Sequence, residues 1–161
     1  MSHITPEILT RSILAVRDMD LRQREQLASE IYASQPHLLA SILALRRFGV
    51  SLEQLEVPLN ILLICYQAMK TTGHPWPVIS ETLQEQCIQR VAGRIRFIEG
   101  LAPEQVTQSV STFVAEHKEP YLLAFVFGEL GAQSLMRIET EAQKFLVLGA
   151  LNLVECMAEA G

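Results

Sequence analysis

Apolar residues recur every three or four positions along most of the chain, which is typical of helices with one buried face. The clearest stripe comprises Ile79, Leu83, Cys87, Val91, Ile95 and Ile98. Polar residues such as Glu81, Glu85 and Arg96 lie off that stripe. Alternation of apolar and polar residues, which would predict strands, is not sustained anywhere. The pattern therefore predicts an all-α protein of about eight helices, arranged as a compact antiparallel helix-pair stack or bundle.

Helix boundaries follow from capping residues, prolines and glycines. We expect helices over about residues 6–18, 21–34, 36–48, 52–70 and 79–99, two that open at Pro103 and Pro120, and a last one over about 138–158. Thr5, Asp20 and Ser51 have side chains that cap helix starts. Gly49 is predicted to end the third helix with a positive φ. Pro58 lacks an N–H group, so we expect a kink or a fresh start there.

A five-residue phrase occurs twice, 84 residues apart, as Pro36-His37-Leu38-Leu39-Ala40 and Pro120-Tyr121-Leu122-Leu123-Ala124. Two further pairs keep the same order: Leu9-x-Arg11 with Val16-Arg17 matches Ile88-x-Arg90 with Ile95-Arg96, and Leu59-Asn60-Ile61-Leu62 matches Leu151-Asn152-Leu153-Val154. These phrases predict one domain over residues 1–161, built by internal duplication from residues 1–73 and 78–161. The alternative is that helices opened by proline resemble one another for physical reasons alone.

Composition and charge narrow the possible partners. Hydrophobic residues make up 49% of the chain, so either helices are buried on several faces or an apolar surface meets a partner. The net charge of −5 opposes nucleic-acid binding, which needs clustered Lys and Arg. The longest apolar run, residues 61–66, is far shorter than a membrane span. Without a signal-peptide pattern at the start, we expect a cytoplasmic protein that does not enter a membrane.

Motifs that carry chemistry are missing from the sequence. It contains no HExxH, no GxSxG and no glycine-rich phosphate loop, so we expect no catalytic residue, no metal and no cofactor. A metal site made from His37 and His117 would require the two predicted halves to converge. Cys65, Cys87 and Cys156 have no CxxC spacing and are interpreted as buried, reduced thiols.

The candidates for a ligand or interface contact are polar or aromatic residues within apolar segments, beside the repeated prolines or in the connector: His37, Asn60, Tyr66, Trp76, Glu116, His117, Tyr121 and Asn152. A buried Asn must form hydrogen bonds or it destabilises the fold. Asn60 and Asn152 could therefore pair with each other, bind backbone freed by Pro58, fix a dimer register or contact a ligand. Trp76 lies between two prolines in the connector and either pins it to the core or anchors a partner.

Three functions remain open from the sequence. The leading hypothesis is a non-catalytic protein–protein interaction or assembly module, a homodimer through the apolar helices near the C-terminus. The second is a small-molecule-binding protein for an apolar or amphipathic ligand, whose cleft between the halves is lined by Tyr66, Met69, Tyr121, Phe125 and Met136. The third is an enzyme with its site at the seam of the halves. It requires one pocket to hold at least two of Glu30, His37, Asn60, Glu116, His117 and Asn152.

Overall fold

The chain folds as an all-α protein, as the apolar periodicity predicts. The computed structural model describes residues 2–161, and Met1, the first residue of the predicted domain, lies outside the described residues. Within that range the elements are α1 (Pro6–Arg17), α2 (Leu21–Ser34), α3 (Pro36–Leu43), the 3₁₀ helix η1 (Ala44–Phe48), α4 (Leu52–Thr72), α5 (Glu81–Glu99), α6 (Pro103–Glu116), α7 (Pro120–Ala132) and α8 (Glu141–Ala160). No strand occurs in the part of the chain that the structure describes.

The predicted helix ends are largely confirmed. The side chains of Thr5, Asp20 and Ser51 each accept a hydrogen bond from a backbone N–H in the first turn of α1, α2 and α4. Gly49 has φ +91°, a conformation that a residue with a Cβ adopts only under strain. The capping residues therefore fix where these helices begin, and a left-handed glycine ends the third helical segment.

Three boundaries differ from the prediction. The third helix tightens to 3₁₀ geometry after Leu43. No new helix begins at Pro58. Instead, α4 continues through Pro58, which is buried. The last helix begins at Glu141 instead of residue 138, because Thr140 and Gln143 form a capping box at that point.

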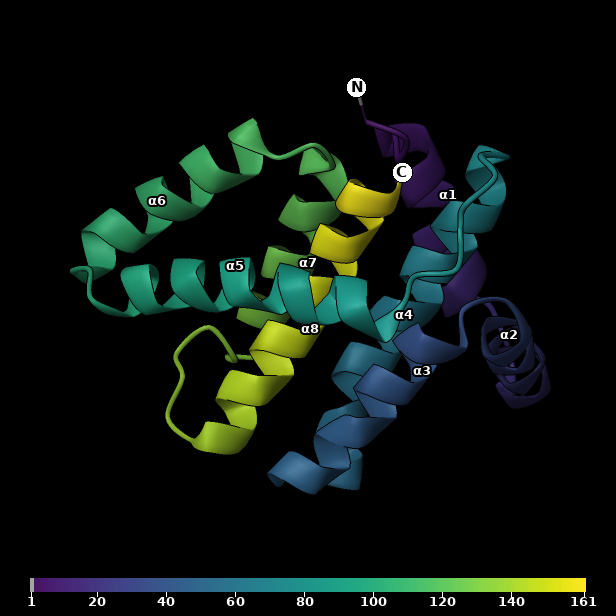
Figure 1. The fold of residues 1–161 in the computed structure, drawn as a ribbon, viewed down its shortest axis with the longest axis horizontal. Helices are drawn as coiled ribbons and strands as arrows, with labels where there is room; N and C mark the ends of the chain where they lie inside the picture. Colours follow the sequence, from purple (N-terminus) through teal and green to yellow (C-terminus); the bar gives the residue numbers. More distant parts are fainter. Residues whose placement is uncertain (1) are drawn as a thin grey trace.

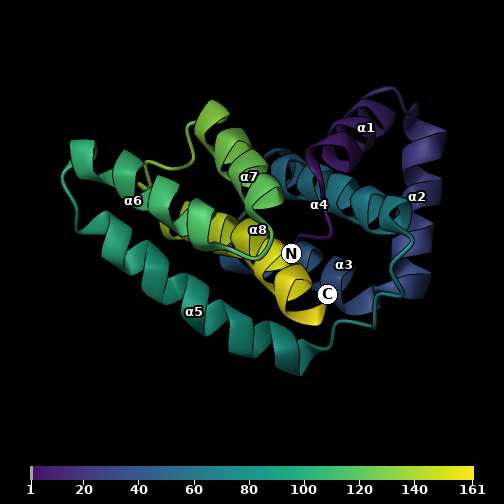
Figure 2. The same ribbon diagram turned by 90° about the horizontal axis from the view of Figure 1, so that it is seen from above.

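Two central helices organise the packing. α4 lies against α8 in the middle of the molecule, α1 packs along α4, and α5 packs along α8 (Figure 1). α2 and α3 cover one end of α4, while α7 lies against both α8 and α6. α6 and the C-terminal part of α5 extend away from the central helices (Figure 2). α6 has no fully buried residue, which agrees with its peripheral place.

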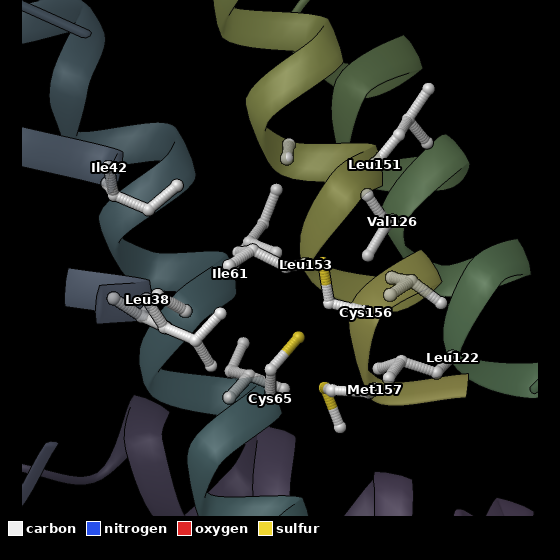
Figure 3. Packing of buried hydrophobic residues seen from close by; sticks show 14 of the residues in the cluster. Leu38, Ile42, Ile61, Cys65, Leu122, Val126, Leu151, Leu153, Cys156 and Met157 are labelled. Carbon is white, nitrogen blue, oxygen red and sulfur yellow. The ribbon is translucent and has the colours of Figure 1, made fainter. Parts of the chain in front are cut away.

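The core absorbs much of the apolar excess that the composition indicated. Buried side chains from α3, α4, α7 and α8 form one core, with those of α3 beside α4 and those of α7 beside α8 (Figure 3). Ten residues of α8 are buried, among them Leu146, Leu151 and Met157. The apolar stretch at the end of the chain is therefore used mainly inside the monomer.

Two buried polar side chains, Gln35 and Glu119, hold the segments that lead into α5 and α1. Gln35 donates from Nε2 to the Pro77 carbonyl oxygen at 2.8 Å and accepts from the Ile79 N–H at 2.9 Å. Glu119 accepts backbone N–H bonds from His3 at 2.7 Å and from Ile4 at 3.1 Å, together with the Ser2 hydroxyl at 3.0 Å. Each side chain precedes a proline that opens a helix, and each satisfies backbone groups of a distant segment.

The three cysteines are free and buried, as the sequence analysis expected. Burial raises the pKa of Cys65 to about 12 and raises the pKa values of Cys87 and Cys156 above the ordinary thiol value. The thiols are therefore protonated at neutral pH and pack as small apolar groups. As for membranes, no helix within residues 2–161 has both the length and the apolar character to cross a bilayer.

Candidate functional site

An apolar hollow opens where α3 and η1, α5 and α8 meet. We call it the seam groove. Its volume is about 370 Å³, which lies within the usual range for small-molecule sites. The lining residues are Ser41, Ala44, Leu45, Phe48, Gln84, Glu85, Ile88, Phe145, Leu148, Gly149, Asn152 and Leu153. The rings of Phe48 and Phe145 stack with their centroids 4.5 Å apart. The groove thus has apolar walls and a flat aromatic pair at one end.

Asn152 is the buried polar residue that α8 contributes to this groove. Its side chain donates from Nδ2 to the Gln84 carbonyl oxygen on α5 at 3.1 Å. That bond fixes the orientation of the amide, and the residue is only 7% exposed. Its Oδ1 atom is buried and accepts no hydrogen bond from the described residues. A buried acceptor without a donor costs about 1–3 kcal/mol, so this atom is an energetic defect of the free protein.

The seam groove continues into a more polar hollow of about 620 Å³ between α3 and the start of α5. The two hollows share Ser41, Ala44, Gln84 and Glu85. The polar end is lined by His37, Arg47 and Glu81, and His37 Nδ1 lies 3.7 Å from Glu81 Oε1. A molecule in the seam groove would therefore have its apolar part near α8 and could extend toward polar groups near the start of α5.

A second cluster of polar side chains joins α5, the segment before α7 and α8. His117 Nε2 lies 2.9 Å from Glu155 Oε2, and Arg90 Nε donates to the other Glu155 oxygen at 3.1 Å. Arg90 also donates from Nη2 to Glu159 at 3.3 Å. These residues line a hollow of about 310 Å³, which Glu116 also reaches. This hollow holds Glu116 and His117 together, so it meets the minimum condition set for an enzyme.

The hydrogen bonds of His117 argue against catalysis at this cluster. Its Nδ1 accepts the backbone N–H of Glu119 at 3.0 Å, so the proton of the neutral ring lies on Nε2 and is donated to Glu155. Both ring nitrogens are thereby engaged within the protein, and the His117 side chain is only 6% exposed. A general base needs a free nitrogen within reach of its substrate. The cluster is therefore interpreted as a structural link between α8 and the start of α7.

The hydrogen bond from His117 lowers the pKa of the Glu155 carboxyl below its ordinary value. Arg90 lowers this pKa further, whereas burial of the group acts in the opposite direction. Because the ionised form is favoured in the folded state, Glu155 adds stability above the pKa it has in the unfolded chain. That contribution is lost as the pH falls through the lowered pKa of the folded protein.

Glu155→Gln is accordingly expected to flatten the acid side of the stability curve. The wild type should lose more free energy of unfolding between pH 5 and pH 3 than the variant does, when both are measured by urea titration at several pH values. Glu104→Gln, which changes an exposed carboxyl on α6, is the matched control and should follow the wild type. Parallel curves for the wild type and Glu155→Gln would contradict the role assigned to this carboxyl.

The other sequence candidates lie apart from the seam groove. Asn60 lines a separate hollow between α1, α2, α4 and α7, so it does not pair with Asn152. Tyr66 is buried and donates to Ser34 Oγ at 3.0 Å. Trp76 is half-buried, and its ring N–H donates to the Met69 carbonyl oxygen on α4 at 3.1 Å. Tyr121 is 48% exposed on the surface of α7.

The cleft expected from Tyr66, Met69, Tyr121, Phe125 and Met136 is not assembled. Met69 is in the core, Phe125 lines the hollow beside Asn60, and Met136 lines another hollow near the start of α6. The reason is that α4 directs Tyr66 and Met69 inward, whereas Tyr121 faces outward on α7. The mainly apolar hollow that joins the first and second parts of the chain lies at α3, η1, α5 and α8 instead.

Two features of these sites were not predicted from the sequence: the aromatic pair that lines the seam groove and the ion pairs of Arg90. Phe48 and Phe145 are 97 residues apart, and no local pattern predicts that their rings stack. Arg90 on α5 pairs with Glu155 and Glu159 on α8, and the local pattern of α5 does not predict these contacts. The spacing of these two glutamates, four residues apart on one helix face, is a signal that could have indicated a shared cation.

Within residues 2–161, no group of three or more His, Cys, Asp or Glu side chains is placed to hold a metal ion. His37 and His117 line different hollows. No protein-family model matches the chain, and no similar curated protein or solved structure was found by sequence and structure comparison. The function of the chain must therefore be inferred from the geometry of its own residues.

Proposed function

We propose that this protein is a non-catalytic binding protein whose seam groove takes a small apolar or amphipathic molecule. The observation that carries the proposal is the hollow itself: about 370 Å³ of mainly apolar space at the junction of three elements. Small-molecule sites are concave, mostly apolar and furnished with few polar groups, and this groove has those properties. Binding there would also cover Phe48, which is 50% exposed.

A fluorescence titration with N-phenyl-1-naphthylamine tests this proposal, because this neutral dye brightens in an apolar site. Ala44 lines both hollows, so Ala44→Trp should fill the groove and reduce dye binding at least tenfold. Ala33→Trp, at an exposed position of α2, is the control for adding an indole and should bind like the wild type. Saturable binding that Ala44→Trp leaves unchanged would place the dye elsewhere and refute the assignment.

Assembly of two copies remains a second proposal. The high apolar content of the sequence suggested an apolar dimer interface. Much of that apolar surface is buried inside the monomer, because ten residues of α8 are buried there, so the support for a dimer is weaker. What remains available near the C-terminus is the outer face of α7, where Tyr121 is exposed. A homodimer through the apolar helices near the C-terminus, a protein partner and a cytoplasmic location stay predictions.

We also propose that the chain arose by internal duplication. In support, α1 lies along α4 as α5 lies along α8, and α4 contacts α8 between them. Gln35 and Glu119 are 84 residues apart, and each holds the segment before a first helix of the opposite half. This reciprocity is expected of two similar units related by a twofold axis, and it is not expected of helices that resemble one another by composition alone.

The capping residues suggest a different register for the first helix of each half. Thr5 caps α1 and Ser80 caps α5, an offset of 75 residues. At this offset the buried residues Leu9, Ser12 and Val16 of α1 correspond to the buried residues Gln84, Cys87 and Val91 of α5. The duplication is therefore proposed with an offset of 75 for these helices. The offset of 79 from the sequence phrases is about one helical turn longer.

A further inference from the structure

The unpartnered acceptor of Asn152 gives the seam groove a chemical preference. Its Nδ2 atom already donates to the Gln84 carbonyl oxygen, and its Oδ1 atom is buried without a donor from the described residues. If leucine replaced Asn152, the groove would lack this unpaired acceptor. A ligand that brings a donor to Oδ1 would remove an existing penalty as well as form a hydrogen bond.

We infer that the ligand of the seam groove is an uncharged ring compound with one hydroxyl or N–H donor that meets Asn152 Oδ1. This inference rests on the proposed function, because it specifies the ligand of the same groove. The stacked rings of Phe48 and Phe145 line the groove with Asn152 and favour a flat, aromatic body. Phenols, fused aromatic alcohols and indoles belong to this class.

The charges around the groove favour a neutral ligand. Among the described residues, Glu85 is the one charged residue that lines the seam groove itself, so a carboxylate or phosphate held there would meet a group of like charge. Arg47 and Glu81, which are opposite in charge, line the adjoining polar hollow. Such anions also offer no donor to an amide oxygen. A cationic head near Asn152 would have to leave water for a site whose nearest polar group is an uncharged amide, which is costly.

A docked helix fits this geometry less well than a small molecule. The backbone N–H groups in the body of a helix are already bonded within the helix, so only a side chain could reach Oδ1. A small ring compound can bring its donor to Oδ1 directly. The size of the groove, about 370 Å³, is also that of a small-molecule site.

Competition against N-phenyl-1-naphthylamine provides the test, with 2-naphthol and 2-methylnaphthalene as probes of nearly equal shape. Only 2-naphthol carries a donor. We expect the preference for 2-naphthol over 2-methylnaphthalene to be about 2- to 12-fold larger in the wild type than in Asn152→Leu, as one hydrogen bond of about 0.5–1.5 kcal/mol implies. Comparing the two probes within each variant cancels the difference in their hydration.

The outcomes separate the inference from the proposed function. If the dye does not bind, or if Ala44→Trp leaves its binding unchanged, the seam groove is no ligand site and both proposals are wrong. If the dye binds in the groove but 2-naphthol does not displace it, the inference about the ligand is wrong and the proposed function stands. If the ratio of the two probe affinities is the same in the wild type and in Asn152→Leu, the groove binds ligands, but Asn152 does not accept a hydrogen bond from them.

A measurement on the wild type keeps the test independent of how well Asn152→Leu folds. In NMR spectra of the unmodified chain, the side-chain amide resonances of Asn152 should shift on addition of 2-naphthol and should move much less with 2-methylnaphthalene. Equal shifts with both probes would overturn the inference. A circular dichroism spectrum and a urea titration of Asn152→Leu establish whether its binding data can be compared with those of the wild type.

Discussion

Replacing Glu119 by alanine is expected to lower the free energy of unfolding by about 3 kcal/mol, because three hydrogen-bond donors lose their acceptor together. These donors are the backbone N–H groups of His3 and Ile4 and the hydroxyl of Ser2. Glu119 is only 1% exposed, so water cannot replace it until the N-terminal segment detaches. Urea titration followed by circular dichroism measures the loss, and hydrogen exchange at Ile4 should report the detachment.

Two further variants show what the Glu119 site requires. Glu119→Gln keeps the shape but presents an NH₂ group, and it cannot accept on both sides, so we expect it to lose part of the same stability. Glu116→Ala removes an exposed carboxyl three residues earlier and should stay within about 0.5 kcal/mol of the wild type. If Glu119→Ala and Glu116→Ala were equally mild, the buried carboxyl would not be holding the N-terminal segment.

Helices could be predicted from this sequence because their determinants are local. A stripe such as Val91, Ile95 and Ile98 fixes the buried face of α5, and a cap such as Ser51 fixes the first residue of α4. Two helix features were predicted wrongly, because nothing in the sequence pattern around them indicates the observed geometry. No proline or glycine marks the change to 3₁₀ geometry at Ala44, and α4 continues through Pro58, which is buried.

The candidate site was predictable only in part, since its contacts join distant residues. Asn152 could be singled out because an amide interrupts an apolar helix, which is a local signal. Its partner is a backbone carbonyl, that of Gln84, and backbone groups leave no trace in a residue pattern. Glu119 was overlooked because it follows Glu116 and His117 in a polar stretch, although its side chain faces the interior.

The repeated phrase leads to the second large effect. Leu38→Ala and Leu122→Ala change equivalent positions of the two copies, and these residues are 1% and 0% exposed. Both side chains belong to the buried core, Leu38 beside α4 and Leu122 between α7 and α8 (Figure 3). We expect each substitution to cost about 2–5 kcal/mol, the usual range for a buried leucine, because the removed atoms leave a cavity among packed neighbours. Leu21→Ala, at a position that is 73% exposed, is the matched control and should change stability little.

The next leucine of each copy allows a finer comparison of the two segments. Leu123 is 1% exposed, whereas Leu39 is only half-buried in α3. Leu123→Ala should therefore cost more than Leu39→Ala in the same urea titrations, although the two residues occupy the same place in the phrase. Equal losses would mean that the packing of the two copies has not diverged at this position. A larger loss for Leu123→Ala would mean that α7 is packed more closely than α3, the helix whose neighbourhood stays open to form the seam groove.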